Sequence, residues 1–285
     1  MHPVLFHILN FPIHSYGFML MLSFLFGILL ASAIAKKNGL NPDVIADIGI
    51  WLILSAIIGA RAYYVILHYD EFRGDLVSII NPFHDGMVGI GGLVMYGGFI
   101  GALIASIIYF RIKRLPFLPY ADAVAPAFGL GVMLTRVGCF MNGCCYGAPT
   151  DHYGVSFPIS SAAGIYQHDM HAVALYPSQL FESVGGFLIF FTVLFIGKRK
   201  PFTGFLFYLA GLMYTVIRFL VDFSRFYAPD ERLGGFSHNQ IFCILFFIIF
   251  SGLILRGLLF KPQPPEVSSI TDGKGEEFKD THRSI

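Results

Sequence analysis

The sequence predicts an all-α membrane protein, a helical bundle of seven transmembrane helices with the N-terminus outside and the C-terminus in the cytoplasm. Three observations carry this prediction. Hydrophobic residues make up 55% and charged residues 13% of 285 positions, the mean hydropathy is +0.68, and basic residues gather at alternate ends of the apolar stretches. A soluble domain needs more polar surface than this. Because lipid cannot hydrogen-bond a free backbone, the spans are expected to be helices.

Seven apolar stretches reach the ~17–25 residues that a helix needs to cross the hydrocarbon core. They are 15–35, 45–67, 87–110, 120–138, 174–196, 203–225 and 238–260. The fourth is the least apolar, since it contains Asp122, Pro126 and several glycines. The third is also rich in glycine, and small residues there permit close approach of another helix or of a ligand.

Orientation follows from the basic residues, which concentrate after the odd-numbered spans and in the tail. They are Lys36, Lys37, Arg111, Lys113, Arg114, Lys198, Arg199, Lys200, Arg256, Lys261, Lys274, Lys279 and Arg283. The positive-inside rule therefore places these ends in the cytoplasm. The N-terminus has no basic n-region and no A-x-A site, so we expect the first span to be retained.

The domain organisation is predicted to be simple. Residues 1–261 form one transmembrane domain, in which the long outer loop at about 139–173 packs as a small cap. Residues 262–285 are polar and rich in Pro, Gly and Ser, which predicts a disordered cytoplasmic tail. A net charge of +1 gives no support for nucleic-acid binding.

Polar residues inside the spans are costly and usually mark function. The candidates are Arg61, Asp122, Arg136, Glu182, Arg218 and Asp222, together with His14, Tyr16, Tyr96 and Tyr214. At ~1.5 Å per residue, all except Asp122 fall in the outer half of the bilayer.

The three arginines among these candidates are expected to reach a similar depth, and we expect the nearby carboxylates not to neutralise all of them. A surplus of guanidinium suits an anion, and a lipid phosphate is available at that depth. Tyr214, Arg218, Asp222 and Arg225 share one helix face. The alternative for that face is a structural Arg218–Asp222 pair.

The segment from Arg136 to Gly147 is rich in glycine and cysteine. Asn142-Gly143 predicts a turn, whose backbone N–H groups can hold a phosphate. For its cysteines, three alternatives stay open: a local disulfide with one spare thiol, a redox-active pair, or a metal site. The metal site would need a fourth ligand from the outer loop. The cysteines are Cys139, Cys144 and Cys145, and the possible fourth ligands are His152, His168 and His171.

Six blocks in this order resemble the prolipoprotein diacylglyceryl transferase family over nearly the whole chain up to the tail. They are His14-Ser15-Tyr16-Gly17, Gly59-Ala60-Arg61 with Tyr64, the run Gly91 to Gly101, Arg136-x-Gly138-x-Phe140-x-Asn142-Gly143-x-x-x-Gly147, Tyr176-Pro177-Ser178-Gln179-Leu180-Phe181-Glu182, and Arg218-x-x-x-Asp222-x-x-Arg225. The family usually has Asn at Cys139, Glu at Cys144, His at Tyr96 and Glu at Asp222, so this chain resembles a divergent, cysteine-rich branch.

The resemblance implies transfer of the diacylglyceryl group of phosphatidylglycerol to the lipobox cysteine thiol of a preprolipoprotein, with glycerol 1-phosphate leaving. This is the first step of lipoprotein maturation in the bacterial inner membrane. It implies a multi-pass enzyme with membrane lipids around it, no metal and no cofactor, and we expect a monomer.

Site residues follow from the same resemblance. Arg136 and Arg218 would stabilise charge on the departing phosphate, and Tyr96 or His14 would accept the thiol proton. The expected phosphatidylglycerol contacts are Arg136, Tyr16, Arg61, Asn142, Gly147, Tyr214, Asp222, Gly97 and Gly98.

Other functions remain open at this point. A thiol-redox membrane protein would use the outer cysteines, and a related lipid transferase would serve another acceptor. A transporter would need a polar path across the membrane, and Asp122 alone marks its inner half.

Overall fold

The computed structural model describes residues 2–8, 11–72, 83–84, 87–88, 95–227 and 232–260, and these are mostly helical. Six helices are long and apolar enough to cross a membrane. They are α1 (Ser15–Lys37), α2 (Asp43–Leu67), α4 (Phe117–Asn142), α6 (Ser178–Ile196), α7 (Phe205–Asp222) and α8 (His238–Phe260). Each lies at a predicted span.

The predicted third span is represented by a shorter helix. Helix α3 runs over Met95–Ile112, and its apolar part is Gly97–Ile112. The span was expected to start at residue 87, but 87–88 belong to a strand and 89–94 lie outside the described residues.

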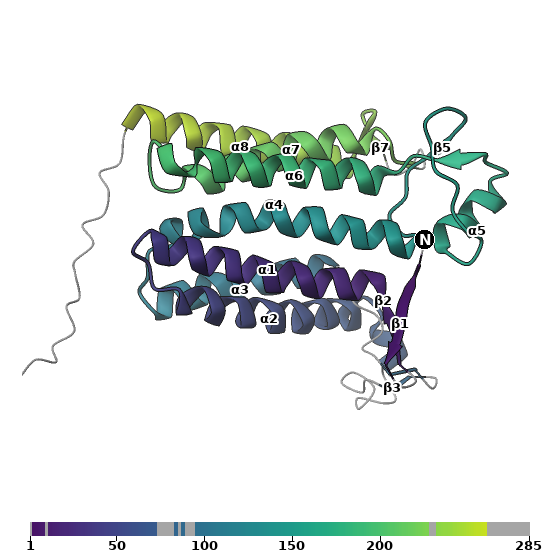
Figure 1. The fold of residues 1–285 in the computed structure, drawn as a ribbon, viewed down its shortest axis with the longest axis horizontal. Coiled ribbons are helices and arrows are strands. Elements are labelled where there is room, and N and C mark those ends of the chain that lie inside the picture. The colour runs from purple at the N-terminus through teal and green to yellow at the C-terminus, as the bar shows by residue number, and fades with distance from the viewer. Residues whose placement is uncertain are drawn as a thin grey trace, which may run out of the picture.

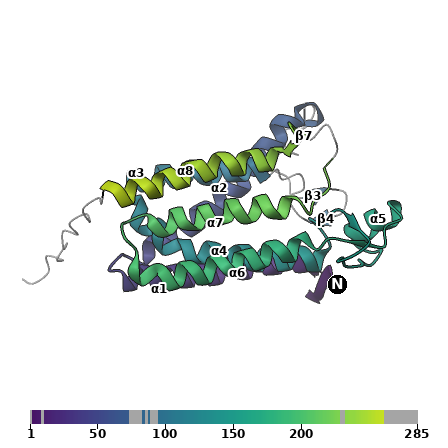
Figure 2. The same ribbon diagram turned by 90° about the horizontal axis from the view of Figure 1, so that it is seen from above.

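Helix α4 is the central element of the bundle. It packs against α1 on one side and against α6 and α7 on the other, while α2 pairs with α3 and α8 with α7. The helices run along the long axis of the molecule, with α1, α2 and α3 on one side of α4 and α6, α7 and α8 on the other (Figure 1). Figure 2 shows the same bundle from above. This position explains the weak hydropathy of the fourth span, because a helix surrounded by protein needs small residues for packing more than lipid-facing ones.

Short antiparallel hairpins, which the all-α prediction did not include, join the helices at one end of the bundle. In the described residues they pair β1 (Val4–Ile8) with β2 (Phe11–His14), β3 (Phe83–His84) with β4 (Met87–Val88), β5 (Pro149–Thr150) with β6 (Ala174–Leu175), and β7 (Arg232–Leu233) with β8 (Phe236–Ser237). Two 3₁₀ turns, η1 (Tyr69–Phe72) and η3 (Gly197–Arg199), follow α2 and α6. Hairpins pair backbone groups that the loops would otherwise leave unpaired.

The segment between α4 and α6, for which a cap over about 139–173 was predicted, packs at one end of the bundle and begins after Asn142 because α4 continues to that residue. The cap contains β5, α5 (Ala162–Asp169) and β6 around Phe157 and Leu175. Gln167 holds it together: the Phe157 backbone N–H donates to Gln167 Oε1 at 2.9 Å, and Gln167 Nε2 donates to Val173 O at 2.8 Å. The predicted tail, 262–285, lies outside the described residues.

Glycines bring α2 and α3 into close contact. A Cβ on Gly97 would overlap the Gly59 carbonyl oxygen and Tyr63 Cβ, and a Cβ on Gly98 would lie 3.1 Å from the Ala56 carbonyl oxygen. Both glycines are buried at this contact. Of the two expected roles, close approach of helices is therefore the one that the structure supports, and the assignment of Gly97 and Gly98 to substrate contact stays a prediction.

The buried carboxylate at the other end of α4 has a structural role. Asp122 is fully buried and accepts hydrogen bonds from Lys200 Nζ at 2.9 Å, Gly204 N at 2.8 Å and Phe207 N at 3.1 Å. It thereby satisfies free N–H groups at the start of α7, where a negative charge is also favoured by the helix dipole. The carboxylate on which a transport path would depend is thus committed to packing.

Replacing Gly97 with Ala should destabilise the bundle by about 1–3 kcal/mol, because the added methyl group must push two backbones apart. Gly131→Ala is the matched control, since a Cβ at Gly131 in α4 meets no atom within 4 Å, and an alanine in a helix interior gains about 0.5–1 kcal/mol over glycine. Thermal unfolding in detergent compares the two. Equal transition temperatures would contradict the close α2–α3 contact.

Candidate functional site

A fully buried carboxylate joins three helices at the end of the bundle that bears the cap. Glu182 of α6 pairs with Arg136 Nη2 of α4 at 2.8 Å and with Arg225 Nη2, just beyond α7, at 3.5 Å. Tyr214 of α7 donates its hydroxyl to the same carboxylate at 3.3 Å. The Glu182 side chain has no solvent exposure, whereas the Arg136 side chain keeps 22%. The carboxylate thus fixes guanidinium groups that still reach the surface of the protein.

A second ion pair lies on α7, one turn beyond Tyr214. Arg218 Nη1 is 3.0 Å from Asp222 Oδ1, an ion pair without hydrogen-bond geometry, because this nitrogen has no hydrogen-bond acceptor among the described residues. Asp222 also accepts hydrogen bonds from the Ser237 hydroxyl and, at 2.7 Å, from the Tyr227 hydroxyl. The carboxylate is therefore held from both sides of the turn that joins α7 to α8.

Arg136 and Arg218 each have a carboxylate partner, whereas the expectation was that the nearby carboxylates would not neutralise all three arginines, Arg61 included. Within the cluster, however, three guanidinium groups share two carboxylates, because Glu182 serves both Arg136 and Arg225. Arg225 Nε is buried and has no acceptor among the described residues. A buried donor of this kind calls for a partner, and an anion with several acceptor oxygens would supply one.

Three thiols lie beside these arginines. Arg136 Nη1 is 3.9 Å from Cys139 Sγ, and the sulfurs of Cys139, Cys144 and Cys145 all lie within 4.8 Å of one another. All three cysteines are free, so the expected local disulfide is absent from this segment. The pKa of the exposed Cys145 thiol lies far below its usual range, first because the Cys139 and Cys144 thiols hydrogen-bond to it and then because the charges of Arg136 and Arg225 favour the thiolate.

The predicted turn is present, but its N–H groups are occupied. Gly143 ends α4 in the left-handed conformation, with φ 72°. Its N–H donates to Phe140 O, and the N–H of Cys144 donates to Cys139 O. The N–H of Gly147 donates to Tyr176 O, and a Cβ there would overlap neighbouring atoms. These groups cap α4 and join the segment to the cap, so the prediction of a backbone phosphate cradle is corrected.

Several other predicted residues do come together at this cluster. Tyr16, at the start of α1, is close enough to the three thiols and to Arg136 to interact with their charges. Asn142, the last residue of α4, hydrogen-bonds to the Cys144 thiol. Because Gly138 packs against the Tyr16 backbone, α1 and α4 meet closely here and bring the phenol beside the cysteines.

Three predicted residues lie elsewhere or are not described. Arg61 is on α2, where its guanidinium lies over the rings of Tyr64 and Phe72, and its expected convergence with Arg136 and Arg218 stays a prediction. His14 is exposed at the N-cap of α1. Tyr96 belongs to the first turn of α3, but its side chain lies outside the described part of the chain.

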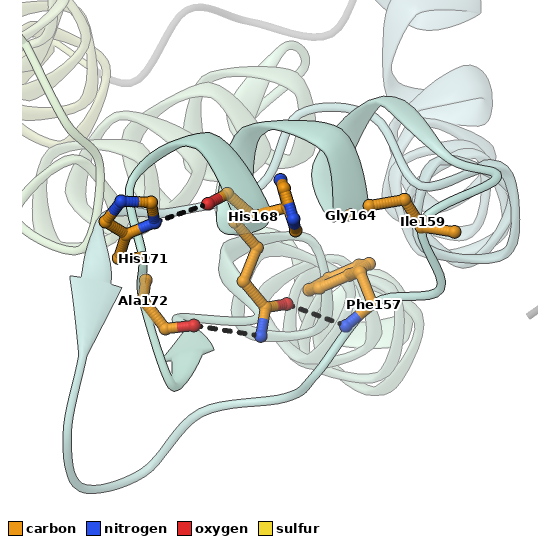
Figure 3. A pocket seen from close by; sticks show the side chains of 7 residues that line it. Phe157, Ile159, Gly164, His168, His171 and Ala172 are labelled. Atoms are coloured by element: carbon orange, nitrogen blue, oxygen red, sulfur yellow. Dashed lines mark hydrogen bonds between the residues drawn. The ribbon is translucent and has the colours of Figure 1, made fainter.

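A hollow in the cap is separate from this cluster. Figure 3 shows it between α5 and the following turn, lined by Phe157, Ile159, Gly164, Gln167, His168, His171 and Ala172. The ring of His171 hydrogen-bonds to the carbonyl oxygen of His168 at 3.1 Å. No residue of the arginine or cysteine cluster lines this hollow, so it is not the candidate site.

Two residues central to the geometry were noted in the sequence but were given no catalytic or lipid-binding role there: Glu182 and Arg225. Both carried a signal: Glu182 is a carboxylate within an apolar span, and Arg225 continues the polar face of α7. A third, Gln179, donates from Nε2 to Cys144 O at 2.7 Å and so positions the cysteine segment. Sequence spacing could not indicate that these residues meet, since they come from different helices.

The chain is similar in sequence to known proteins over most of its length. A sequence model described as prolipoprotein diacylglyceryl transferase matches residues 3–256. A phosphatidylglycerol–prolipoprotein diacylglyceryl transferase of Finegoldia magna is 33% identical over 257 residues, covering 90% of this chain and 95% of that protein. Proteins of the same name from Clostridium tetani (34% identical; 92% of this chain, 100% of that protein) and Listeria welshimeri (31%; 92% of each) are also similar.

Proposed function

This chain belongs to the prolipoprotein diacylglyceryl transferase family, and from that premise we propose that it transfers the diacylglyceryl group of phosphatidylglycerol to the lipobox cysteine of preprolipoproteins. The observation that carries the proposal is the cluster in which Arg136, Arg218 and Arg225 share two buried carboxylates. Its surplus guanidinium charge suits the phosphate of an anionic lipid.

The position of the cluster supports a lipid substrate. Arg136 lies in the second-to-last turn of α4, and Arg218 lies one turn before the end of α7. Both helix ends face the cap (Figure 1). A phosphate held there would lie at headgroup depth, while its acyl chains remain beside the apolar helices. The carbon to be transferred would then sit at the boundary between the two regions.

The chemistry breaks the bond between a glycerol carbon and a phosphate oxygen. The sulfur of the acceptor cysteine supplies an electron pair for the new C–S bond, and the electron pair of the broken C–O bond leaves with glycerol 1-phosphate. Arg136 and Arg218 would stabilise the charge that grows on this leaving group, and the free Nε of Arg225 would donate to it. Four further polar residues would position the lipid headgroup or the three arginines: Tyr16, Tyr214, Asp222 and Asn142.

The acceptor thiol must also lose its proton, because a thiol with a pKa of about 8.5 is mostly protonated at neutral pH. The nearby guanidinium charge would favour the thiolate. Tyr96 and His14 stay our proposals for the proton acceptor, and Arg61 our proposal for a further lipid contact. The steps described above use only the protein's own side chains.

We further propose that α3 completes a set of seven spans, with the N-terminus outside and the C-terminus in the cytoplasm of a bacterial inner-membrane protein that acts as a monomer. Exposed basic residues support the orientation: Lys36 and Lys37 end α1, and Arg111 lies near the end of α3. These helix ends are opposite the cap.

Replacing Arg136 or Arg218 with Ala should lower the transfer rate by about 10²–10³-fold, the effect of losing one donor that stabilises transition-state charge. Purified protein is incubated with labelled phosphatidylglycerol and a lipobox peptide, and thioether-linked diacylglycerol is measured. Arg111→Ala is the matched control, an exposed arginine at the opposite end of the bundle. Normal transfer by either cluster variant would contradict the proposal.

Orientation is tested by introducing one cysteine at a time at two positions and labelling intact cells with a membrane-impermeant maleimide. Tyr153→Cys, in the exposed part of the cap, should react, and Lys113→Cys, beyond α3, should react only after the membrane is opened. Peptide mass mapping separates these labels from native Cys145. The reverse pattern would refute the proposed topology.

A further inference from the structure

The three thiols at the end of α4 have no assigned role in the transfer reaction. Cys139 is buried in the last turn of α4, Cys144 is half-buried, and Cys145 is exposed. Their sulfurs all lie within 4.8 Å of one another, and this is the one group of clustered metal-ligand side chains among the residues that the structure describes. A disulfide would use two of these sulfurs and leave the third without a function.

The spacing of the sulfurs is close to that of a metal site. Around a tetrahedral Zn²⁺ with Zn–S bonds of ~2.3 Å, neighbouring sulfurs lie ~3.8 Å apart. Small side-chain rotations would bring three sulfurs within 4.8 Å to that distance.

The backbone that carries the thiols is already fixed by the protein. The Cys144 N–H donates to Cys139 O at 3.1 Å, Gln179 Nε2 donates to Cys144 O at 2.7 Å, and Gly143 supplies the left-handed turn between them. The arrangement therefore exists before any ion binds.

We infer that Cys139, Cys144 and Cys145 form a three-thiolate Zn²⁺ site whose fourth position is open to the thiol of the acceptor cysteine. This inference deepens the proposed function and rests on it for the identity of the fourth ligand. Zinc sites with three protein ligands and one open position are typical of catalysis, whereas structural sites are closed by four.

The open position is supported by the location of the histidines. The sequence offered His152, His168 and His171 as a fourth ligand, but none of them belongs to the group of clustered ligands. His168 and His171 instead line the hollow in the cap (Figure 3). The exposed side of the cluster, at Cys145, remains accessible to a ligand from outside.

The site lies where the reaction needs its nucleophile. Cys139 Sγ is 3.9 Å from Arg136 Nη1, and the Arg136 guanidinium belongs to the cluster proposed to hold the lipid phosphate. A thiol bound at the open position would thus lie next to the glycerol carbon attached to that phosphate. Proximity of the two reactants lowers the entropic cost of their meeting.

Zinc would also solve the protonation problem of the acceptor. A thiol that coordinates Zn²⁺ loses its proton, which would pass to the proton acceptor proposed above. Its sulfur then forms the C–S bond, the C–O bond breaks with its electron pair leaving on glycerol 1-phosphate, and the neutral thioether dissociates from the ion. Zn²⁺ keeps its oxidation state throughout, so no electron donor or acceptor is required.

Zinc binding is tested on the full-length protein in detergent under reducing conditions. The protein is stripped with a chelator and titrated with Zn²⁺ alone or with Co²⁺, whose sulfur-to-cobalt absorption reports thiolate ligands. We expect one ion per chain. Cys139→Ser, Cys144→Ser and Cys145→Ser should each weaken binding by more than ~100-fold, since even outer-shell changes cost 10–100-fold. Cys243→Ser, at a buried position in α8, is the matched control.

The open position is tested by adding a lipobox peptide to the Co²⁺ form. The cobalt bands should shift with the cysteine peptide and not with its Cys→Ser counterpart. Failure of the wild-type protein to bind Zn²⁺ more tightly than the serine variants would overturn the site, as would recovery of the cysteines as a disulfide. A cobalt spectrum unchanged by the peptide would overturn the role of the fourth position.

These outcomes are separable from failure of the proposed function, because metal binding is read without turnover. A triple serine variant that binds no zinc yet transfers diacylglycerol at the normal rate would refute the zinc role and leave the transferase intact. If the protein binds zinc but transfers no lipid to any lipobox peptide, the proposed function is refuted. The zinc site is then retained, and the acceptor thiol is rejected as its fourth ligand.

Discussion

The buried carboxylate of Glu182 is the constraint from which the arrangement of the site follows. A fully buried carboxylate is tolerated only when opposite charges and hydrogen bonds compensate it, and Glu182 obtains these from Arg136, Arg225 and Tyr214. The three partners come from α4 and from the α7 region, so one carboxylate on α6 fixes three segments. Removing Glu182 would leave Arg136 and Arg225 without this partner. The ion pairs with Glu182 therefore determine where the two guanidinium groups lie.

The two ends of α4 use the same device for different purposes. Asp122 at one end accepts hydrogen bonds from Lys200 and the Gly204 N–H in the α6–α7 connection and from the Phe207 N–H in the first turn of α7, so its charge is used in holding the bundle together. At the other end, three guanidinium groups meet two carboxylates and one buried Nε stays without an acceptor. The first end is compensated within the protein. The second keeps a buried N–H group without an acceptor among the described residues, and this difference is what the proposed lipid-phosphate site rests on.

Much of the fold was predictable, because hydropathy and the length of a span are local properties. The six long helices lie at the predicted positions, and the Arg218–Asp222 pair follows from i, i+4 spacing on one helix. Contacts between helices were not predictable, because they depend on how each helix is rotated about its axis. For that reason the sequence did not show that Glu182 meets Arg136 and Arg225, or that Gly97 packs α3 against α2. The turn at Gly143 was recognised, but its N–H groups are used to cap α4.

The most direct measurement is the binding of phosphatidylglycerol to the purified protein, followed by native mass spectrometry with phosphatidylcholine as the competing lipid. The surplus guanidinium charge predicts that the wild-type protein prefers phosphatidylglycerol and that Arg136→Gln weakens its binding by about 10–100-fold, the value of a hydrogen bond to a charged group. Arg111→Gln, at the opposite end of the bundle, should leave the preference unchanged. Equal binding of phosphatidylglycerol by wild-type protein and Arg136→Gln would contradict the account.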